Sequence, residues 1–240
     1  MRMMMKSVMA GALVSLATAA GSAGANAAAC MTPSSYSVWV DSAGFSCEIG
    51  DKTFSNFTYI PSGTNLVQDE AVAVGLINNG SAGIGLQFNA PWSAATGQTS
   101  DATIGFTVAV TPPTGGVSII DASLAQLDGV SPDGSASVAE RGCTPAPCNP
   151  LGGFLSLLTF DPPPGNTAKN TVFAPVGNLQ VEKDISVIGG TIPGSFATLS
   201  QVQNTFSQTA VPEPASLAIL GVSLLGMGAA AAARRRRFRK

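Results

Sequence analysis

Four acidic side chains lie at positions where carboxylates could perform chemistry. Asp69 and Glu70 are adjacent, while Asp128 and Asp133 fall in turns that contain glycine. A pair of carboxylates could hydrolyse a glycosidic bond, and a turn rich in oxygen ligands could bind calcium. However, the run 128–133 lacks the alternating oxygen ligands of a calcium loop, and aspartate favours turns because its side chain caps the local backbone. We therefore expect these four residues to be solvated turn and strand-edge residues.

The sequence contains no histidine. This excludes the Ser-His-Asp and Cys-His catalytic arrangements and every zinc or copper site with a histidine ligand. The sequence also lacks the Gly-x-Ser-x-Gly motif of hydrolases. We therefore expect that the protein is not an enzyme, and we assign no catalytic, cofactor-binding or metal-binding residue.

Four aromatic residues offer a second kind of candidate site: Tyr36, Trp39, Tyr59 and Trp92. Exposed rings could form a platform on which sugars stack. Isolated rings in a β-sandwich are more often part of the core, because each ring buries a large apolar area. We expect these rings to be in the core.

The four cysteines, Cys30, Cys47, Cys143 and Cys148, form an even set. An oxidising compartment would pair them, and their spacing favours the disulfides Cys30–Cys47 and Cys143–Cys148 over the two other pairings. The shorter loop should stabilise the fold less, because closing it restricts the unfolded chain less. A metal site is the alternative, but the cysteines lack paired Cys-x-x-Cys spacing.

Residues 1–29 have the pattern of a secretory signal peptide read by the secretion machinery. A positively charged start is followed by a short apolar run over 8–20 and then by small residues. That run is shorter than the roughly 20 residues that a membrane span needs. Cleavage could follow Ala27 or Ala29, and the second site would make Cys30 the first residue. A lipid-modified Cys30 is a lesser alternative.

The C-terminal residues 211–240 combine three features. Pro212, Glu213 and Pro214 precede an apolar stretch, which is followed by a basic end. The basic end consists of Arg234, Arg235, Arg236, Arg237, Arg239 and Lys240. A helix over 215–233 would be about 28 Å long, close to the hydrocarbon core of about 30 Å. The basic end would stay in the cytoplasm, because positive charge is retained on that side, and the preceding domain would lie outside.

This order of a Pro-Glu-Pro motif, one membrane helix and a basic tail resembles the PEP-CTERM sorting signal. The resemblance covers residues 211–240. It implies recognition by an exosortase, an integral-membrane cysteine transpeptidase-like enzyme of Gram-negative bacteria. Pro212, Glu213 and Pro214 match the recognition motif, and the basic end matches the anchor. A plain C-terminal membrane anchor is the alternative.

Residues 30–210 predict one all-β ectodomain, a single antiparallel two-sheet sandwich, ahead of the membrane helix. Short segments of alternating polarity are separated by turn residues, for example at 131–134. We expect strands at 36–40, 54–59, 71–77, 84–89, 102–111, 117–127, 135–140, 154–160, 179–188 and 196–208. Strict alternation within 54–59 would place Phe54 and Phe57 on opposite faces.

The ectodomain carries thirteen acidic and four basic side chains, a net charge of −9. Nucleic-acid binding requires clustered lysine and arginine, so we expect no nucleic-acid partner. The leader and the tail predict a precursor in the inner membrane with a periplasmic ectodomain. After processing, the expected location is the cell surface or the extracellular space.

Three further runs, 47–59, 183–185 and 206–208, resemble segments of ectodomains that carry this tail. No biochemical activity comes with that resemblance. The family implies a structural or adhesive surface or matrix protein, processed by an exosortase and associated with exopolysaccharide. A secreted carbohydrate-binding module or hydrolase with the same tail is the alternative.

Overall fold

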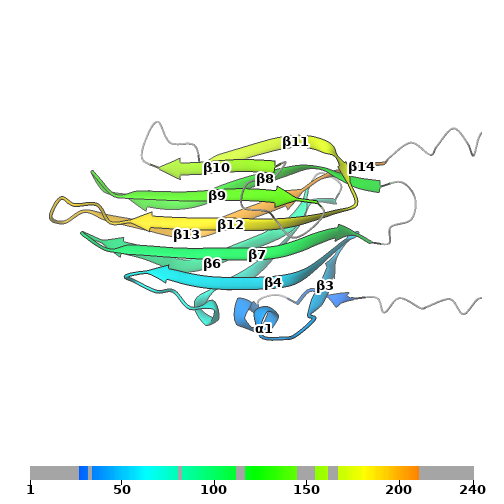
Figure 1. The fold of residues 1–240 in the computed structure, drawn as a ribbon, viewed down its shortest axis with the longest axis horizontal. Coiled ribbons are helices and arrows are strands. Elements are labelled where there is room, and N and C mark those ends of the chain that lie inside the picture. Colours follow the sequence, from blue (N-terminus) through cyan, green and yellow to red (C-terminus); the bar gives the residue numbers. More distant parts are fainter. Residues whose placement is uncertain are drawn as a thin grey trace, which may run out of the picture.

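The computed structural model describes residues 27–31, 34–80, 83–111, 117–144, 155–161 and 167–210. These residues form a β-sandwich of two sheets with one short α-helix (Figure 1). All strand pairs are antiparallel except one, which joins two short N-terminal segments. The prediction of an antiparallel two-sheet sandwich is therefore confirmed.

Sheet A contains seven of the strands. In spatial order they are β1 (Ala28–Ala29), β3 (Ser46–Ile49), β4 (Lys52–Gly63), β7 (Thr99–Val110), β12 (Asn178–Ile188), β9 (Ser135–Cys143) and β10 (Leu155–Asp161). The parallel pair is β1 with β3, and Ala28 lies opposite Cys47.

Sheet B contains the other strands. In spatial order they are β11 (Ala168–Val176), β8 (Val117–Val130), β13 (Phe196–Phe206), β6 (Ile84–Ala95), β5 (Ala73–Asn78) and β2 (Ser34–Ser35). A further strand, β14 (Gln208–Ala210), also pairs with β8. Thus β13 is a central strand with β8 on one side and β6 on the other, and the chain runs from it into β14.

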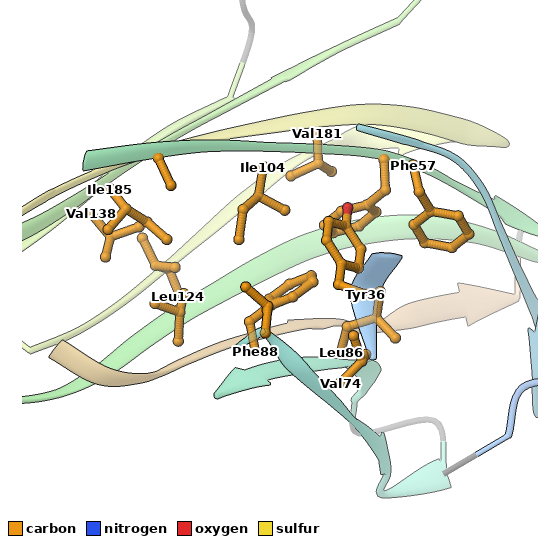
Figure 2. Packing of buried hydrophobic residues seen from close by; sticks show 14 of the residues in the cluster. Tyr36, Phe57, Val74, Leu86, Phe88, Ile104, Leu124, Val138, Val181 and Ile185 are labelled. Atoms are coloured by element: carbon orange, nitrogen blue, oxygen red, sulfur yellow. The ribbon is translucent and has the colours of Figure 1, made fainter. Parts of the chain in front are cut away.

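The core lies between the two sheets. Figure 2 shows Ile104, Val181 and Ile185 pointing from sheet A toward Leu124 and Phe88 of sheet B. Successive side chains of a strand point to opposite faces, so alternating apolar residues give each sheet one buried face. The two buried faces together form one continuous cluster of apolar side chains.

The segment Tyr36–Val40 is a helix, α1, so the strand predicted there was wrong. Its aromatic and β-branched residues favour a strand locally. A strand would point Tyr36 and Trp39 to opposite faces, whereas one helical turn places residues three apart on the same face. Both rings are buried in the structure, so burial of the two rings outweighs the local preference.

Strand β4 does not keep the strict alternation that the sequence predicted. Phe54 and Phe57 are both buried, although three positions separate them. The pairing with β7 shifts between Ser55 and Thr58, and Asn56 has a positive φ of 55°. This β-bulge inserts one residue and returns Phe57 to the core face.

The remaining strand predictions are confirmed in position, with shifted ends. Strand β5 begins two residues late, because a 3₁₀ turn, η1 (Asp69–Ala71), precedes it. No strand was predicted for β1, β2, β3 or β11. In the part of the chain that the structure describes, no helix is long and apolar enough to cross a membrane. The predicted span 215–233 lies outside that part.

Candidate functional site

The predicted sorting motif, Pro212, Glu213 and Pro214, lies outside the described residues, as does the basic end 234–240. The sandwich itself extends almost to the motif, because β14 ends at Ala210.

The predicted disulfide between Cys30 and Cys47 is present, with the two Cα atoms 4.8 Å apart. It joins the residue after β1 to β3, and the backbone N–H of Cys30 also donates to the carbonyl of Glu48 at 3.0 Å. The start of the ectodomain is thereby held against sheet A. Cys143, at the end of β9, is also disulfide-bonded, and its predicted partner Cys148 lies outside the described residues.

The acidic candidates belong to separate turns and strand ends. Asp69 and Glu70 lie in η1, Asp128 lies near the end of β8, and Asp133 lies in the turn between β8 and β9. Asp133 accepts hydrogen bonds from two backbone N–H groups of the β12–β13 connection, at 2.7 and 2.9 Å. Asp133 therefore joins its turn to a connection that is distant in sequence, whereas the sequence predicted that it would cap its own turn. Among the described residues, no group of three or more Cys, Asp or Glu side chains could hold a metal ion.

The aromatic candidates lie in the core, as expected. Tyr36, Trp39 and Trp92 are at most 2% exposed, and Tyr59 packs against the same core. The Tyr36 hydroxyl donates to the carbonyl of Gly105 at 3.0 Å, which satisfies its buried polar atom. These rings stabilise the sandwich and are not available for stacking against a sugar.

A cluster of three polar side chains lies inside the sandwich, and the sequence analysis did not identify it. Lys183 on β12 and Asn204 on β13 are 0% exposed, and Glu140 on β9 is 2% exposed. Lys183 and Glu140 are directly opposed residues of neighbouring strands in sheet A. Asn204 reaches them from sheet B. We call these three residues the inter-sheet cluster.

The inter-sheet cluster is closed by hydrogen bonds. Lys183 Nζ pairs with Glu140 Oε2 and donates to Asn204 Oδ1 at 2.8 Å. Asn204 Nδ2 donates to Glu140 Oε1 at 3.2 Å and to the carbonyl oxygen of Ser123 at 2.9 Å. The Phe106 ring centroid lies 5.5 Å from Nζ. Each buried polar group therefore has a partner, which limits the cost of burying it.

Burial shifts the charge balance of the inter-sheet cluster toward neutral groups. Loss of solvent lowers the pKa of Lys183 and raises the pKa of Glu140, while the attraction between the two opposes both shifts. In such an environment the proton can reside on the carboxyl group and leave a neutral amine. A neutral amine is a nucleophile, whereas an ammonium group is not.

A second lysine occupies a similar but more open position at the edge of the core. Lys52 Nζ donates to Asp51 Oδ1 at 3.1 Å and to Gln208 Oε1 at 2.7 Å. Gln208 Nε2 in turn donates to Asp51. The Lys52 side chain is buried, but that of Asp51 is 36% exposed. Water therefore reaches this cluster, which we call the edge cluster.

The outer face of sheet A carries a shallow polar depression of about 380 Å³. It is lined by Thr103, Ala139, Arg141, Ser156, Glu182 and Asp184. Glu140 also borders it, but the Glu140 side chain is 0% exposed and belongs to the inter-sheet cluster. Arg141 pairs with Glu182 across the depression. None of the described residues that line it is aromatic, so they do not form a sugar-stacking platform.

A signal for the inter-sheet cluster was present in the sequence. In β12 every second residue from Leu179 to Val187 is buried, and Lys183 occupies the same phase. Glu140 likewise follows the buried positions of β9. A charged residue at an apolar phase of two strands predicts a buried pair, because a lone buried charge is strongly disfavoured.

No protein-family model matches the chain, and no curated protein matches it. Among solved structures, the enzymatically active domain of bacteriophage CBA120 tailspike protein 4 is 17% identical, with a TM-score of 0.25; the match covers 61% of this chain and 19% of that chain. A family 11 carbohydrate-binding module from Clostridium thermocellum, in complex with a beta-1,3-1,4-mixed-linked tetrasaccharide, is 8% identical, with a TM-score of 0.20; the match covers 65% of this chain and 96% of that chain. Likeness at these TM-scores carries no argument about function.

Proposed function

We propose that the protein is an exported surface or extracellular-matrix protein with a structural or adhesive role, sorted through its C-terminal tail by an exosortase. The observation that carries this proposal is the extent of the sandwich. Its first strand begins at Ala28 and its last ends at Ala210, so the fold fills the interval between the leader and the Pro-Glu-Pro motif. The Cys30–Cys47 disulfide at its start supports an oxidising destination.

The positions and contacts of the candidate side chains support a structural role. Asp133 holds a turn, and the aromatic rings fill the core. The inter-sheet cluster is buried between the sheets, so a soluble substrate cannot reach it. Association with exopolysaccharide remains part of the proposal, and a polysaccharide-binding assay on the processed protein tests it.

Replacing Glu213 with alanine should stop processing and leave membrane insertion intact. Glu213 is the only charged residue between Asp184 and Arg234, whereas the apolar stretch lies beyond it. A precursor with an epitope tag after Lys240 should therefore accumulate in the membrane fraction as a larger, tagged species. The measurement is fractionation followed by immunoblotting, beside the wild type.

Ser216→Ala is the matched control, because it changes a small side chain just outside the motif. It should lose the tag as the wild type does. Retention of the tag by mature wild-type protein, or normal processing of Glu213→Ala, would reduce the tail to a plain anchor.

The mature chain should begin at Ala28, which means that the leader is cut after Ala27. Ala28 and Ala29 form β1 and pair with Cys47 and Glu48. Cleavage after Ala29 would remove this strand and leave its backbone partners on β3 unpaired. N-terminal sequencing of the exported protein decides the point, and a start at Cys30 would show that β1 is dispensable.

A further inference from the structure

We propose that Lys183 and Asn204 become joined by an isopeptide bond between Nζ and Cγ, with Glu140 as the proton-transfer group. The bond would connect β12 of sheet A to β13 of sheet B. It is independent of the sorting proposal, because it depends only on residues within the sandwich.

The attacking and the attacked groups are already in contact. Lys183 Nζ lies 2.8 Å from Asn204 Oδ1, which is bonded directly to the carbon that would be attacked. Both residues are 0% exposed and lie on strands with a hydrogen-bonded neighbour on each side, interrupted only by the register shift in β13 between Leu199 and Gln201. Two groups fixed in this way react as if one were present at a very high concentration.

Glu140 touches both nitrogen atoms of the reaction. Its Oε2 contacts the attacking Nζ of Lys183, and its Oε1 accepts from the departing Nδ2 of Asn204 at 3.2 Å. One carboxyl group can therefore receive a proton from Nζ and deliver a proton to Nδ2. The bond from Nζ to Cγ forms, the bond from Cγ to Nδ2 breaks, and ammonia leaves. No group is oxidised or reduced, and no co-reactant is required.

The surroundings favour the neutral groups that this reaction needs. Exclusion of water lowers the pKa of Lys183 and raises the pKa of Glu140, so an amine and a carboxylic acid can face each other. The Phe106 ring lies beside Nζ and keeps the site apolar. Water is also excluded as a competing nucleophile toward Asn204.

The edge cluster provides an internal comparison. It too brings together a lysine, a carboxylate and a carboxamide, in Lys52, Asp51 and Gln208. Its carboxylate is 36% exposed, so water can solvate the charged forms and carry protons away. We expect no bond between Lys52 and Gln208.

Mass spectrometry of the full chain, reduced and alkylated, tests the proposal. The protein should be lighter than its sequence by one ammonia molecule. Trypsin should no longer cut after Lys183, because the Lys183 side chain has become an amide. Residues 170–234 should therefore be recovered as one peptide, in place of the two fragments 170–183 and 184–234. Cleavage after Lys52 should be retained. This measurement needs only wild-type protein, so it does not depend on whether a variant folds.

Variants assign the reaction to the cluster. Glu140→Gln keeps the shape of the side chain but cannot carry the proton, and Asn204→Ala removes the attacked carbon. Each variant should have the mass calculated from its own sequence, without loss of ammonia, and trypsin should cut it after Lys183. Glu182→Gln makes the same change at a position facing outward and should remain linked.

Three results would overturn the proposal. The first is wild-type protein of full mass that is cut after Lys183. The second is loss of ammonia with cleavage after Lys183 retained, which would indicate a modification of asparagine alone. The third is linkage that persists in Glu140→Gln.

Discussion

A Glu140→Ala chain is expected to be less stable than the wild type by about 3–5 kcal/mol in its free energy of unfolding. The substitution removes the carboxyl group that faces Lys183 and leaves the 0% exposed amine without that partner. Asn204 also loses one acceptor. Urea unfolding followed by circular dichroism measures the difference. A loss below about 1 kcal/mol would show that Lys183 finds water or another partner.

Two controls separate the loss of the buried partner of Lys183 from other effects of the substitution. Glu182→Ala breaks the pair with Arg141, which joins the same two strands one position away but on the outer face. That loss should be about 0–1 kcal/mol, because exposed pairs contribute little. The double variant Lys183→Met with Glu140→Leu cannot form the proposed bond either. It should still be more stable than Glu140→Ala, because no buried amine is left without its partner.

Phe106→Ala is expected to lower the free energy of unfolding by about 3–5 kcal/mol. The ring is 1% exposed and lies between both sheets, with the rings of Phe54, Phe88 and Phe206 at centroid distances of 6.1, 6.1 and 6.2 Å. Its removal leaves a cavity that strands pairing on both sides cannot close. The same urea titration provides the measurement.

Phe196→Ala is the matched control, since it makes the same change at the start of β13, where the ring is 48% exposed. Its cost should be about 1 kcal/mol or less. Equal losses in the two variants would mean that the core around Phe106 relaxes to fill the space.

The class of fold could be predicted from the sequence because alternation and turns repeat along most of the chain. The exceptions depend on contacts distant in sequence. Helix α1 forms where the residues favour a strand, because both Tyr36 and Trp39 must reach the same core. The bulge at Asn56 could not be predicted from the neighbouring residues either. It depends on the packing of Phe57 in the core between the sheets.

The inter-sheet cluster illustrates the same limit for a site. Lys183 lies in phase with its apolar neighbours, so its burial could have been read from the sequence. Asn204 could not, because β13 has a register shift between Leu199 and Gln201. Buried positions are odd-numbered before the shift and even-numbered after it. A one-residue bulge thus moves Asn204 from the outer face to the core.

The position of β13 in sheet B determines how the domain would resist mechanical tension. The chain reaches Ala210 through β14, which pairs with β8, and directly before it lies β13, which has hydrogen-bonded neighbours on both sides, β8 and β6. A pull along the axis of such a strand loads many backbone hydrogen bonds together, whereas an edge strand pulled sideways would peel away one bond at a time. If the domain is tethered through its C-terminus, as we propose, drag from its surroundings would pass through β14 into β13, a strand that is hydrogen-bonded on both sides.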